Sequence, residues 1–387
     1  MSEWKKVKLG DYCLKIGSGS TPKGGSTVYV ESGTSFIRSQ NVYNLSFDYN
    51  GLTHITEEAA NKLKGVTIFN EDILLNITGD SVARTCIVPN DVLPARVNQH
   101  VAIVRVDRKK MNGRFLNYYL ASPRMQAHML SLAVGKGASR NAMTKQMIEN
   151  FNVPCPPLDT QHRIATILSR YDSLIENYQK QIKLLEESAQ CLYKEWFIDL
   201  RFPGHENTKI VDGVPEGWDK KKVGDVTPIK TGKKDANFGT NDGPFPFFTC
   251  AQEPIKAPSY SFDTNAVILA GNGDFNVKLY RGKFEAYQRT YVLEPINDKM
   301  LYLLYFCIAE NMKRLAIEAS GSTIKFLTKG MIENLVINEP STIVLDSFNK
   351  IIEPIRTQKE KLISQIIHLT EARDRLLPKL MSGEIKV

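Results

Sequence analysis

The sequence predicts an α+β protein with two β-rich globular parts, each followed by a long helix. Three observations support this prediction. The chain repeats itself, its globular parts alternate short apolar runs with turn residues, and two stretches carry apolar residues at helical spacing. With 387 residues, the chain is long enough for about two domains and their connectors.

A unit of about half the chain occurs twice, which indicates a tandem duplication. Residues 147–150, Met-Ile-Glu-Asn, recur at 331–334, and the surrounding segments 137–150 and 321–334 align without a gap. One shared tetrapeptide is weak evidence, but further matches keep the same order along the chain. These matches are Trp4 with Gly10-Asp11 and Trp218 with Gly224-Asp225, 73–80 and 267–274, Gln99 and Gln288, and 167–168 and 351–352.

Each copy begins with a loop-rich, mostly antiparallel β part. In the first copy we expect strands at 34–42, 72–78 and 100–106, where short apolar runs alternate with Gly, Ser, Asn and Pro. A helical pattern follows at 115–132, and the prolines of 153–157 end it, because proline cannot continue a helix. The second copy repeats this order with strands near 244–249 and 266–270, a helix from 300 to about 319, and an exit segment at 336–340.

A long stretch with apolar residues at steps of three and four follows each exit segment. In the first copy these residues are Leu168, Tyr171, Leu174 or Ile175, Tyr178, Ile182, Leu185, Ala189, Leu192 and Trp196. In the second copy they are Ile352, Ile355, Leu362, Ile366, Leu369, Leu376 and Leu380, with Lys359 and Arg373 interrupting the series. Each stretch of about 35 residues would form a helix about 50 Å long. Such a narrow apolar seam favours pairing of the two helices with each other; packing of each against its own domain is the alternative.

Proline and glycine residues separate the two copies. They cluster at 202–207 and 213–218, which is typical of a linker, and they place the boundary near residue 205. The predicted parts are therefore a first globular domain at 1–157 and a first helical region with linker at 158–205. A second globular domain at 206–341 and a second helical region at 342–387 follow.

The charge of the chain favours a polyanionic partner. The net charge is +8 and the isoelectric point is near 9.0. Excess Lys and Arg favours nucleic acid because each neutralised phosphate releases counterions; a solvated basic surface is the alternative. No apolar run reaches the length of a membrane span, so we expect a cytoplasmic protein. The six cysteines are scattered without a C-x-x-C pair, which predicts free thiols and no metal site.

Motifs for catalysis are lacking. The sequence has no phosphate-binding loop, nucleophile elbow, H-E-x-x-H pair or Asn-Pro-Pro-aromatic element. Asp80 and Asp274 occupy matching positions after strands, where capping of a turn is the favoured role over catalysis. The sequence therefore predicts no catalytic residue and no bound cofactor.

Polar loops at matching positions in the two copies are the candidates for recognition. Arg and Lys can bind guanine through paired hydrogen bonds, and Asn and Gln can bind adenine in the same way. The loops differ in residues while their frameworks agree, as expected for readers of two different short sequences. The candidate DNA-binding residues are Arg38, Gln40, Asn41, Arg84, Gln99, Lys136, Arg140, Asn272, Lys278, Arg289 and Lys325.

The chain resembles the specificity subunit (S, HsdS) of a Type I restriction–modification system. The resemblance covers essentially the whole length, and its motifs are specific in this order and spacing. They are Trp4 with 9–11 (Leu-Gly-Asp), 156–158 (Pro-Pro-Leu) with 161–165 (Gln-His-Arg-Ile-Ala), 196–199 (Trp-Phe-Ile-Asp) with 201–204 (Arg-Phe-Pro-Gly), 215–218 (Pro-Glu-Gly-Trp) and 376–385. In the second copy, Asp346-Ser347-Phe348 replaces the Gln-His-Arg-Ile type of exit, which leaves the start of the second helix open.

The resemblance implies a non-catalytic subunit with two target-recognition domains. The two conserved helices would pack as an antiparallel coiled coil with pseudo-twofold symmetry, and each domain would read one half of a bipartite double-stranded DNA sequence. The helices would dock two modification subunits, which hold S-adenosylmethionine and carry the methyltransferase activity. Two motor-nuclease restriction subunits would complete a restricting complex.

Two other classes of function remain open from the residues alone. One is a self-contained DNA methyltransferase or nuclease, which the missing motifs argue against. The other is a protein-interaction scaffold with duplicated heads, for which binding would lack the steep salt dependence of DNA binding. An RNA-binding role is less favoured because the loops lack aromatic stacking platforms.

Overall fold

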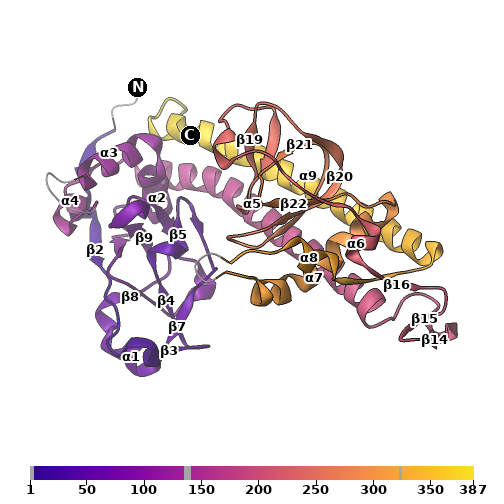
Figure 1. Cartoon of the computed structure of the whole chain (residues 1–387). Helices are drawn as coiled ribbons and strands as arrows, with labels where there is room; N and C mark the ends of the chain where they lie inside the picture. Colours follow the sequence, from indigo (N-terminus) through magenta and orange to yellow (C-terminus); the bar gives the residue numbers. More distant parts are fainter. Residues whose placement is uncertain (1–3, 135–140, 322–324) are drawn as a thin grey trace. The chain divides into compact units, whose positions relative to one another are not determined.

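The computed structural model describes residues 4–134, 141–321 and 325–387, which form two compact units (Figure 1). The first unit consists of Met1–Gln179 and Ile363–Val387, and the second of Lys180–Leu362. The division between the units therefore cuts through both long helices, whereas the sequence placed its boundaries where these helices start. Each globular domain is compact together with one half of each long helix.

The first unit contains two main sheets and short helices. The four-stranded sheet has the order β10 (Thr85–Ile87), β9 (Ile73–Asn76), β12 (Val101–Val106), β2 (Cys13–Ser18). The five-stranded sheet has the order β3 (Tyr29–Val30), β7 (Thr53–Ile55), β4 (Thr34–Ile37), β11 (Ala95–Val97), β8 (Thr67–Ile68), and β5 (Val42–Tyr43) pairs with β6 (Ser46–Phe47). The helices of this domain are α1 (Glu57–Lys62), α2 (Gly113–Ala121), α3 (Pro123–Ala133) and α4 (Lys145–Glu149).

The sequence predicted one helix at 115–132, and the structure divides it into α2 and α3. The Asn112 side chain accepts a hydrogen bond from the Phe115 N–H and starts α2. Ser122 has φ −65° and ψ 145°, an extended conformation, directly before Pro123. A residue before proline is disfavoured in the helical region, so α2 ends there and Pro123 opens α3.

The second unit is built around one six-stranded sheet. Its order is β17 (Ile229–Thr231), β22 (Thr290–Leu293), β20 (Phe262–Ala270), β21 (Val277–Ala286), β18 (Phe245–Phe248), β19 (Ile255–Ala257). The short pair β14 (Ile210–Val211) and β15 (Val214–Pro215) precedes it, and the helices of the domain are α6 (Val223–Val226), α7 (Leu301–Glu318) and α8 (Lys329–Glu333). The buried residues Val267, Leu269 and Leu293 from the sheet share a core with Leu303 and Leu304 of α7.

The repeated sequence forms the same local structure in both units. The start of each domain pairs with its exit as a two-stranded antiparallel sheet: β1 (Lys6–Lys8) with β13 (Asn152–Pro154), and β16 (Asp219–Lys222) with β23 (Val336–Glu339). The next hydrogen bond is also repeated, from the Leu9 N–H to the Phe151 carbonyl at 2.9 Å and from the Val223 N–H to the Leu335 carbonyl at 2.8 Å.

The Gly-Asp and Met-Ile-Glu-Asn motifs are repeated because they contact each other. A Cβ atom on Gly10 would lie 3.1 Å from the Cβ of Glu149, and one on Gly224 would lie 3.2 Å from the Cβ of Glu333. Only glycine allows this approach without a shift of the helix. The short helices α4 and α8 are capped in the same way. The Thr144 side chain accepts a hydrogen bond from the Met147 N–H, and the Thr328 side chain accepts one from the Met331 N–H.

The two long helices start at equivalent positions. Helix α5 (Leu158–Tyr193) and helix α9 (Thr342–Met381) begin with the same separation as the repeated tetrapeptides. The sequence left the start of the second helix open. The structure places it at the position equivalent to the start of α5, although the residues there differ. In the first copy the buried Gln161 fixes the helix by accepting the Asn112 N–H at 2.9 Å, and the second copy has the buried Leu345 at that position.

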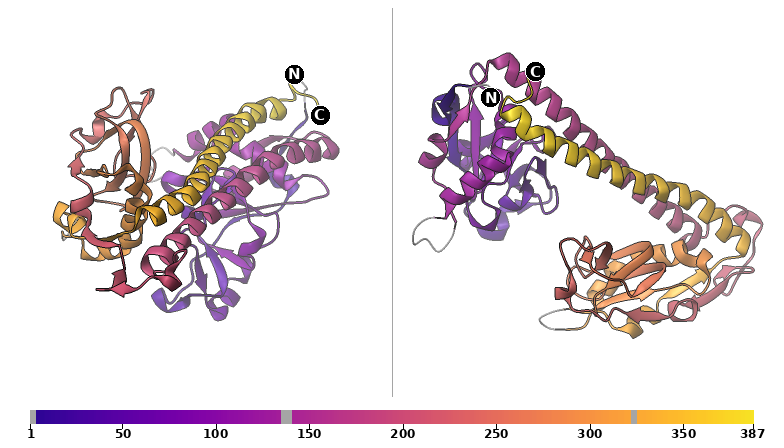
Figure 2. Two further views of the ribbon diagram at one scale, coloured as in Figure 1. Left: turned by 90° about the vertical axis from the view of Figure 1, so that its right-hand side faces the viewer. Right: turned by 90° about the horizontal axis from the view of Figure 1, so that it is seen from above.

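Within each unit the two long helices lie side by side in opposite directions (Figure 2). In the first unit Arg373 binds Asp172 across the pair at 2.7 Å, and in the second unit Lys359 binds Glu186 at 2.5 Å. The two basic residues that interrupt the apolar series thus each form an ion pair with an acid of the other helix. The predicted antiparallel helix pairing is confirmed.

One residue assigned to this pair does not belong to it. Leu174 is 44% exposed, whereas the neighbouring Ile175 is partly buried. Successive residues point about 100° apart around a helix, so only one of the two can face the partner. The other predicted members are at least partly buried; they are Tyr178, Ile182, Leu185, Leu192, Leu362, Ile366, Leu369 and Leu376.

Candidate nucleic-acid interface

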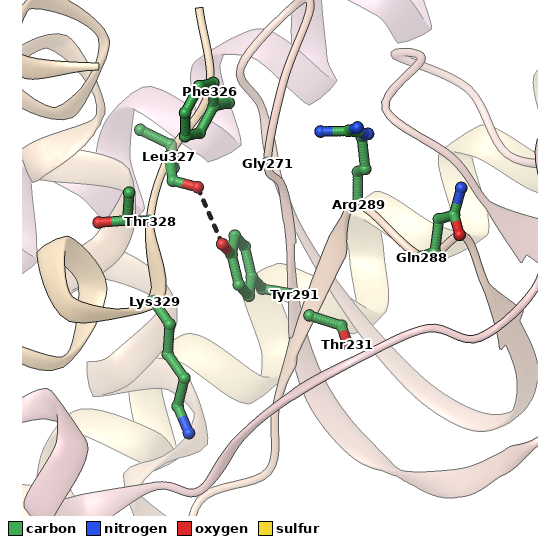
Figure 3. Close-up of a pocket in the computed structure, with 9 residues that line it drawn as sticks. All are labelled: Thr231, Gly271, Gln288, Arg289, Tyr291, Phe326, Leu327, Thr328 and Lys329. Atoms are coloured by element: carbon green, nitrogen blue, oxygen red, sulfur yellow. Dashed lines mark hydrogen bonds between the residues drawn. The ribbon is translucent and has the colours of Figure 1, made fainter. Parts of the chain in front are cut away.

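In the second unit, segments far apart in the sequence converge beside α8 (Figure 3). The Leu327 N–H donates to the Gly271 carbonyl at 2.8 Å, and the Gly271 N–H donates to the Arg289 carbonyl at 2.9 Å. The Tyr291 hydroxyl donates to the Leu327 carbonyl at 2.8 Å and fixes its ring between these segments. The result is an open pocket of about 500 Å³ at the ends of β17, β20 and β22.

The side chains around this pocket combine cations, an amide and an aromatic ring. Arg289 and Lys329 are exposed and lie on opposite sides of the Tyr291 ring in Figure 3. Gln288 is held by Asp235, to which its side-chain nitrogen donates at 2.8 Å, and Phe326 is 38% exposed. A cationic rim, an oriented amide and an apolar floor suit the phosphates and base edges of nucleic acid.

The first unit has the same backbone arrangement with other side chains. The Met143 N–H donates to the Ile77 carbonyl at 2.8 Å, and the Ile77 N–H donates to the His100 carbonyl at 2.9 Å. The Thr78 hydroxyl lies 2.6 Å from Nδ1 of His100, and Gln99 accepts a hydrogen bond from Thr21. The framework is thus repeated at this face, while the side chains that it presents differ.

Glycine permits β2 and β17 to end in close backbone contact near these faces. A Cβ atom on Gly19 would overlap the Val97 carbonyl, and one on Gly232 would overlap the Ala286 carbonyl. Gly19 and Gly232 therefore have a packing role, because the missing side chain lets backbone lie against backbone.

A family model for the Type I restriction modification DNA specificity domain matches residues 1–187 and 215–362. The chain belongs to this family. It is 26% identical over 421 aligned residues to the MjaIX specificity subunit of Methanocaldococcus jannaschii, a match covering all of this chain and 94% of that protein. It is 40% identical over 178 residues to the EcoDI specificity subunit of Escherichia coli, covering 44% of this chain and 39% of that protein.

The fold is also shared with a solved member of the family. The crystal structure of the S subunit from M. genitalium matches with a TM-score of 0.60 at 16% identity, covering 98% of this chain and 96% of that one. This likeness supports the α+β class with two β-rich domains and long helices. In the part of the chain that the structure describes, no group of side chains could hold a metal ion, and no helix is long and apolar enough to cross a membrane.

The structure of this family member places several candidate DNA-binding residues at accessible positions. Gln99, Arg289 and Lys325 are exposed, and Asn272 is partly exposed where its backbone pairs with Phe326. All four lie in the converging segments of the two equivalent faces. Gln40 is exposed as well, but it lies in a different loop. There its side-chain nitrogen donates to the Gly51 carbonyl at 3.4 Å.

Other candidates are engaged within the protein. Arg38 donates to the Gly51 carbonyl at 2.7 Å, and the guanidinium of Arg84 lies 4.5 Å from the centre of the Tyr43 ring. Lys278 donates to the Ala251 carbonyl at 2.9 Å, and burial lowers the pKa of its ammonium group. Each of the three would have to give up such a contact to bind DNA.

Asn41 is a correction to the prediction. Its side chain is fully buried and donates to the Asp48 and Asn50 carbonyls at 2.9 and 3.2 Å, while it accepts the Arg38 N–H at 3.0 Å. Its amide therefore stabilises a loop and is not free to contact a base. Lys136 and Arg140 lie outside the described residues.

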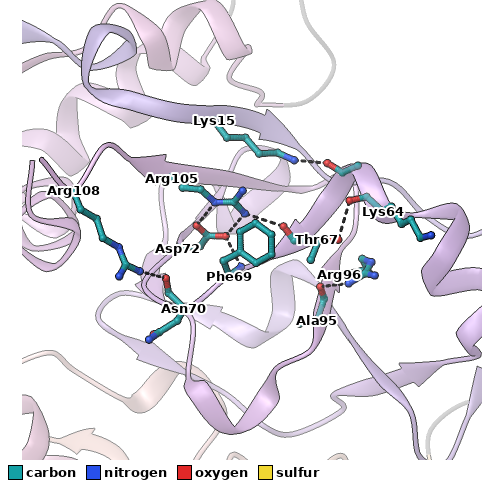
Figure 4. Close-up of polar contacts among 11 residues, drawn as sticks. Lys15, Lys64, Thr67, Phe69, Asn70, Asp72, Ala95, Arg96, Arg105 and Arg108 are labelled. Atoms are coloured by element: carbon teal, nitrogen blue, oxygen red, sulfur yellow. Dashed lines mark hydrogen bonds and ion pairs between the residues drawn. The ribbon is translucent and has the colours of Figure 1, made fainter. Parts of the chain in front are cut away.

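A second group of basic side chains, in the first unit, is also satisfied internally (Figure 4). Arg105 binds Asp72 through two hydrogen bonds at 2.8 and 2.7 Å, and its guanidinium stacks over the Phe69 ring at 4.1 Å. The buried Arg96 donates to the Ala60 and Ala95 carbonyls at 3.1 and 3.0 Å, and burial lowers its pKa. These charges stabilise the fold, so net charge alone does not locate the interface.

The candidate list lacked Gln288, Tyr291, Phe326 and Lys329, which the structure brings to the pocket. Two of them carried a signal, since Gln288 aligned with Gln99 and Lys329 aligned with Lys145 in the repeat. Phe326 has no such counterpart, because Ala142 aligns with it in the first copy.

Proposed function

We propose that the chain is the DNA-recognition subunit of a Type I restriction–modification complex and reads a bipartite DNA target. The observation that carries this proposal is the pair of equivalent faces, built on one repeated framework but presenting different side chains. A duplicated reader with divergent contacts suits two different half-sites separated by unread base pairs. Membership of the specificity family and the net charge of +8 support the same reading.

The chain contributes recognition, and the partners contribute chemistry. In this proposal two modification subunits bind the long helices, hold S-adenosylmethionine and methylate the DNA, and two motor-nuclease subunits join in a restricting complex. The long helices offer exposed apolar side chains outside their mutual contact, such as Leu184 at 61% and Ile367 at 52% exposure. Exposed apolar residues along paired helices suit protein docking.

Selection from random DNA tests the proposal directly. The full chain, assembled with its modification subunits, should recover from a pool of random duplexes two short motifs at one fixed separation. Binding should weaken steeply as salt is raised, because several phosphates are neutralised. A single continuous motif, or no motif, would exclude bipartite recognition, and binding that ignores salt would favour a protein-interaction scaffold.

Arg289 provides a test of which face reads which half-site. We expect Arg289→Ala to weaken binding by about 1–3 kcal/mol and to relax the sequence preference in one half-site only, the range for a specific base contact. The same selection with the variant measures this. Lys209→Ala is the matched control, because Lys209 is exposed in the linker and carries the same charge. Equal losses in both variants would show that Arg289 supplies only general charge.

A further inference from the structure

In the first unit, a buried tyrosine links the recognition domain to the helix pair. Tyr118 of α2 is 3% exposed, and its hydroxyl donates to Oδ2 of Asp172 in α5. The other oxygen of Asp172 accepts from Arg373 of α9 at 2.7 Å. The domain and both long helices therefore meet in one hydrogen-bonded group.

The second unit contains the corresponding contact. Tyr302 of α7 is 4% exposed and donates to Oε2 of Glu353 in α9 at 2.5 Å. Arg281 of β21 binds both oxygens of Glu353, at 2.8 and 3.1 Å, and also donates to the Tyr302 hydroxyl at 3.0 Å. Here too a tyrosine of the domain contacts a carboxylate of the helix that follows it.

The two contacts use equivalent tyrosines but different acids. Tyr118 and Tyr302 have the same separation as the repeated tetrapeptides. Glu353 lies about one helical turn earlier in α9 than Asp172 does in α5, and Arg356 occupies the position that corresponds to Asp172. If the contact had only been retained after duplication, both the tyrosine and the acid would occupy equivalent positions. The acid lies at a different position in the second copy, which indicates that both copies require a contact between this tyrosine and the helix.

The chemistry of the contact makes it directional and strong. Burial and the neighbouring acids raise the pKa of both phenols, that of Tyr302 to about 12. Each hydroxyl therefore stays protonated and donates to a carboxyl group that is also paired with an arginine, and charge-assisted hydrogen bonds of this kind are stronger than neutral ones. A buried hydroxyl that lost this partner would be left unsatisfied, which disfavours other orientations of the domain.

We infer that Tyr118 and Tyr302 are positioning residues, each of which fixes the orientation of its recognition domain against the following helix so that the half-sites are read at one separation. This inference rests on the proposed function, since it concerns how the two half-sites are presented. Neither tyrosine contacts DNA in this role. Their effect is on the spacing that is accepted, and the base preference within each half-site stays unchanged.

The test uses Tyr118→Phe, Tyr302→Phe and the double variant, each as the full chain with its modification subunits. Random duplexes are selected with each protein, and the separation between the two motifs is counted. The wild type should give one separation. The variants should give about a tenfold larger share of sequences one base pair longer or shorter, the scale expected for losing one hydrogen bond to a charged group.

Tyr119→Phe is the matched control. Tyr119 is the neighbour of Tyr118 in α2, and its hydroxyl donates to the Asn152 carbonyl at 3.3 Å within the recognition domain. This variant should keep the wild-type separation, and thermal unfolding should show that all variants fold. One unchanged separation in every variant would overturn the positioning role alone. If the wild type selects no split motif, the proposed function fails first, and the positioning role fails with it.

Discussion

Replacing Phe197 by alanine is expected to destabilise the second unit by about 3–5 kcal/mol, the usual cost of removing a buried phenylalanine. Phe197 is 2% exposed and lies at the centre of an aromatic cluster. Its ring centre is 4.8 Å from that of Phe348, in an edge-to-face arrangement, and 5.6 Å from that of Trp218. These three residues come from the turn after α5, from α9 and from the start of the second domain.

The neighbouring Ile198 supplies the control. It is 54% exposed, so Ile198→Ala should change stability by less than about 1 kcal/mol. Unfolding by denaturant can be followed through tryptophan fluorescence, since Trp196 and Trp218 both lie next to Phe197. Similar midpoints for the two variants would mean that the cluster does not hold the second unit together.

The burial of two adjacent aromatic residues depends on a local change in helix geometry. The turn that directly follows α5, Lys194–Ile198, is a π-helix, and both Trp196 and Phe197 are buried in it. The helical spacing in the sequence placed only Trp196 in the apolar series. A π-helical turn has one extra residue, which changes the direction of the side chains after it. Spacing alone does not reveal such an insertion.

Features set by local sequence or by the duplication were predictable. The repeat indicated the equivalent framework, and the prolines of 153–157 directly precede the start of α5 at Leu158. The start of α9 at Thr342 was left open by the sequence. Capping by Thr144 and Thr328 and the close approach of Gly10 to Glu149 explain in retrospect why those motifs recur. Signals of this kind depend on contacts between positions whose order the duplication preserves.

The candidate site depended on long-range contacts and was predicted only in part. Gly271, Tyr291 and Leu327 form the pocket through hydrogen bonds between separate strands and the segment before α8. Whether a polar loop residue is free also depends on distant groups. The Asn41 side chain donates to the carbonyls of Asp48 and Asn50, while Arg289 remains exposed. Both residues lie in segments that the sequence predicts to be polar loops.

Replacing Asp72 by alanine is expected to destabilise the first unit by about 3 kcal/mol, because it leaves the Arg105 charge without its partner in the interior. The Asp72 side chain is 1% exposed and that of Arg105 is 21% exposed. Asp72 also accepts the Phe69 N–H at 2.7 Å, so a backbone donor loses its partner as well. Urea unfolding of the variant, compared with the wild type, measures the loss.

The adjacent Glu71 makes the comparison specific to burial. Glu71 binds Arg108 at 3.3 Å, and their side chains are 38% and 61% exposed, so Glu71→Ala should cost less than about 1 kcal/mol. A double variant, Asp72→Ala with Arg105→Met, should recover part of the loss, because it removes the charge that the single variant leaves unpaired. If the double variant is less stable than Asp72→Ala, the cost lies in lost packing of Arg105 over Phe69 and not in its unpaired charge.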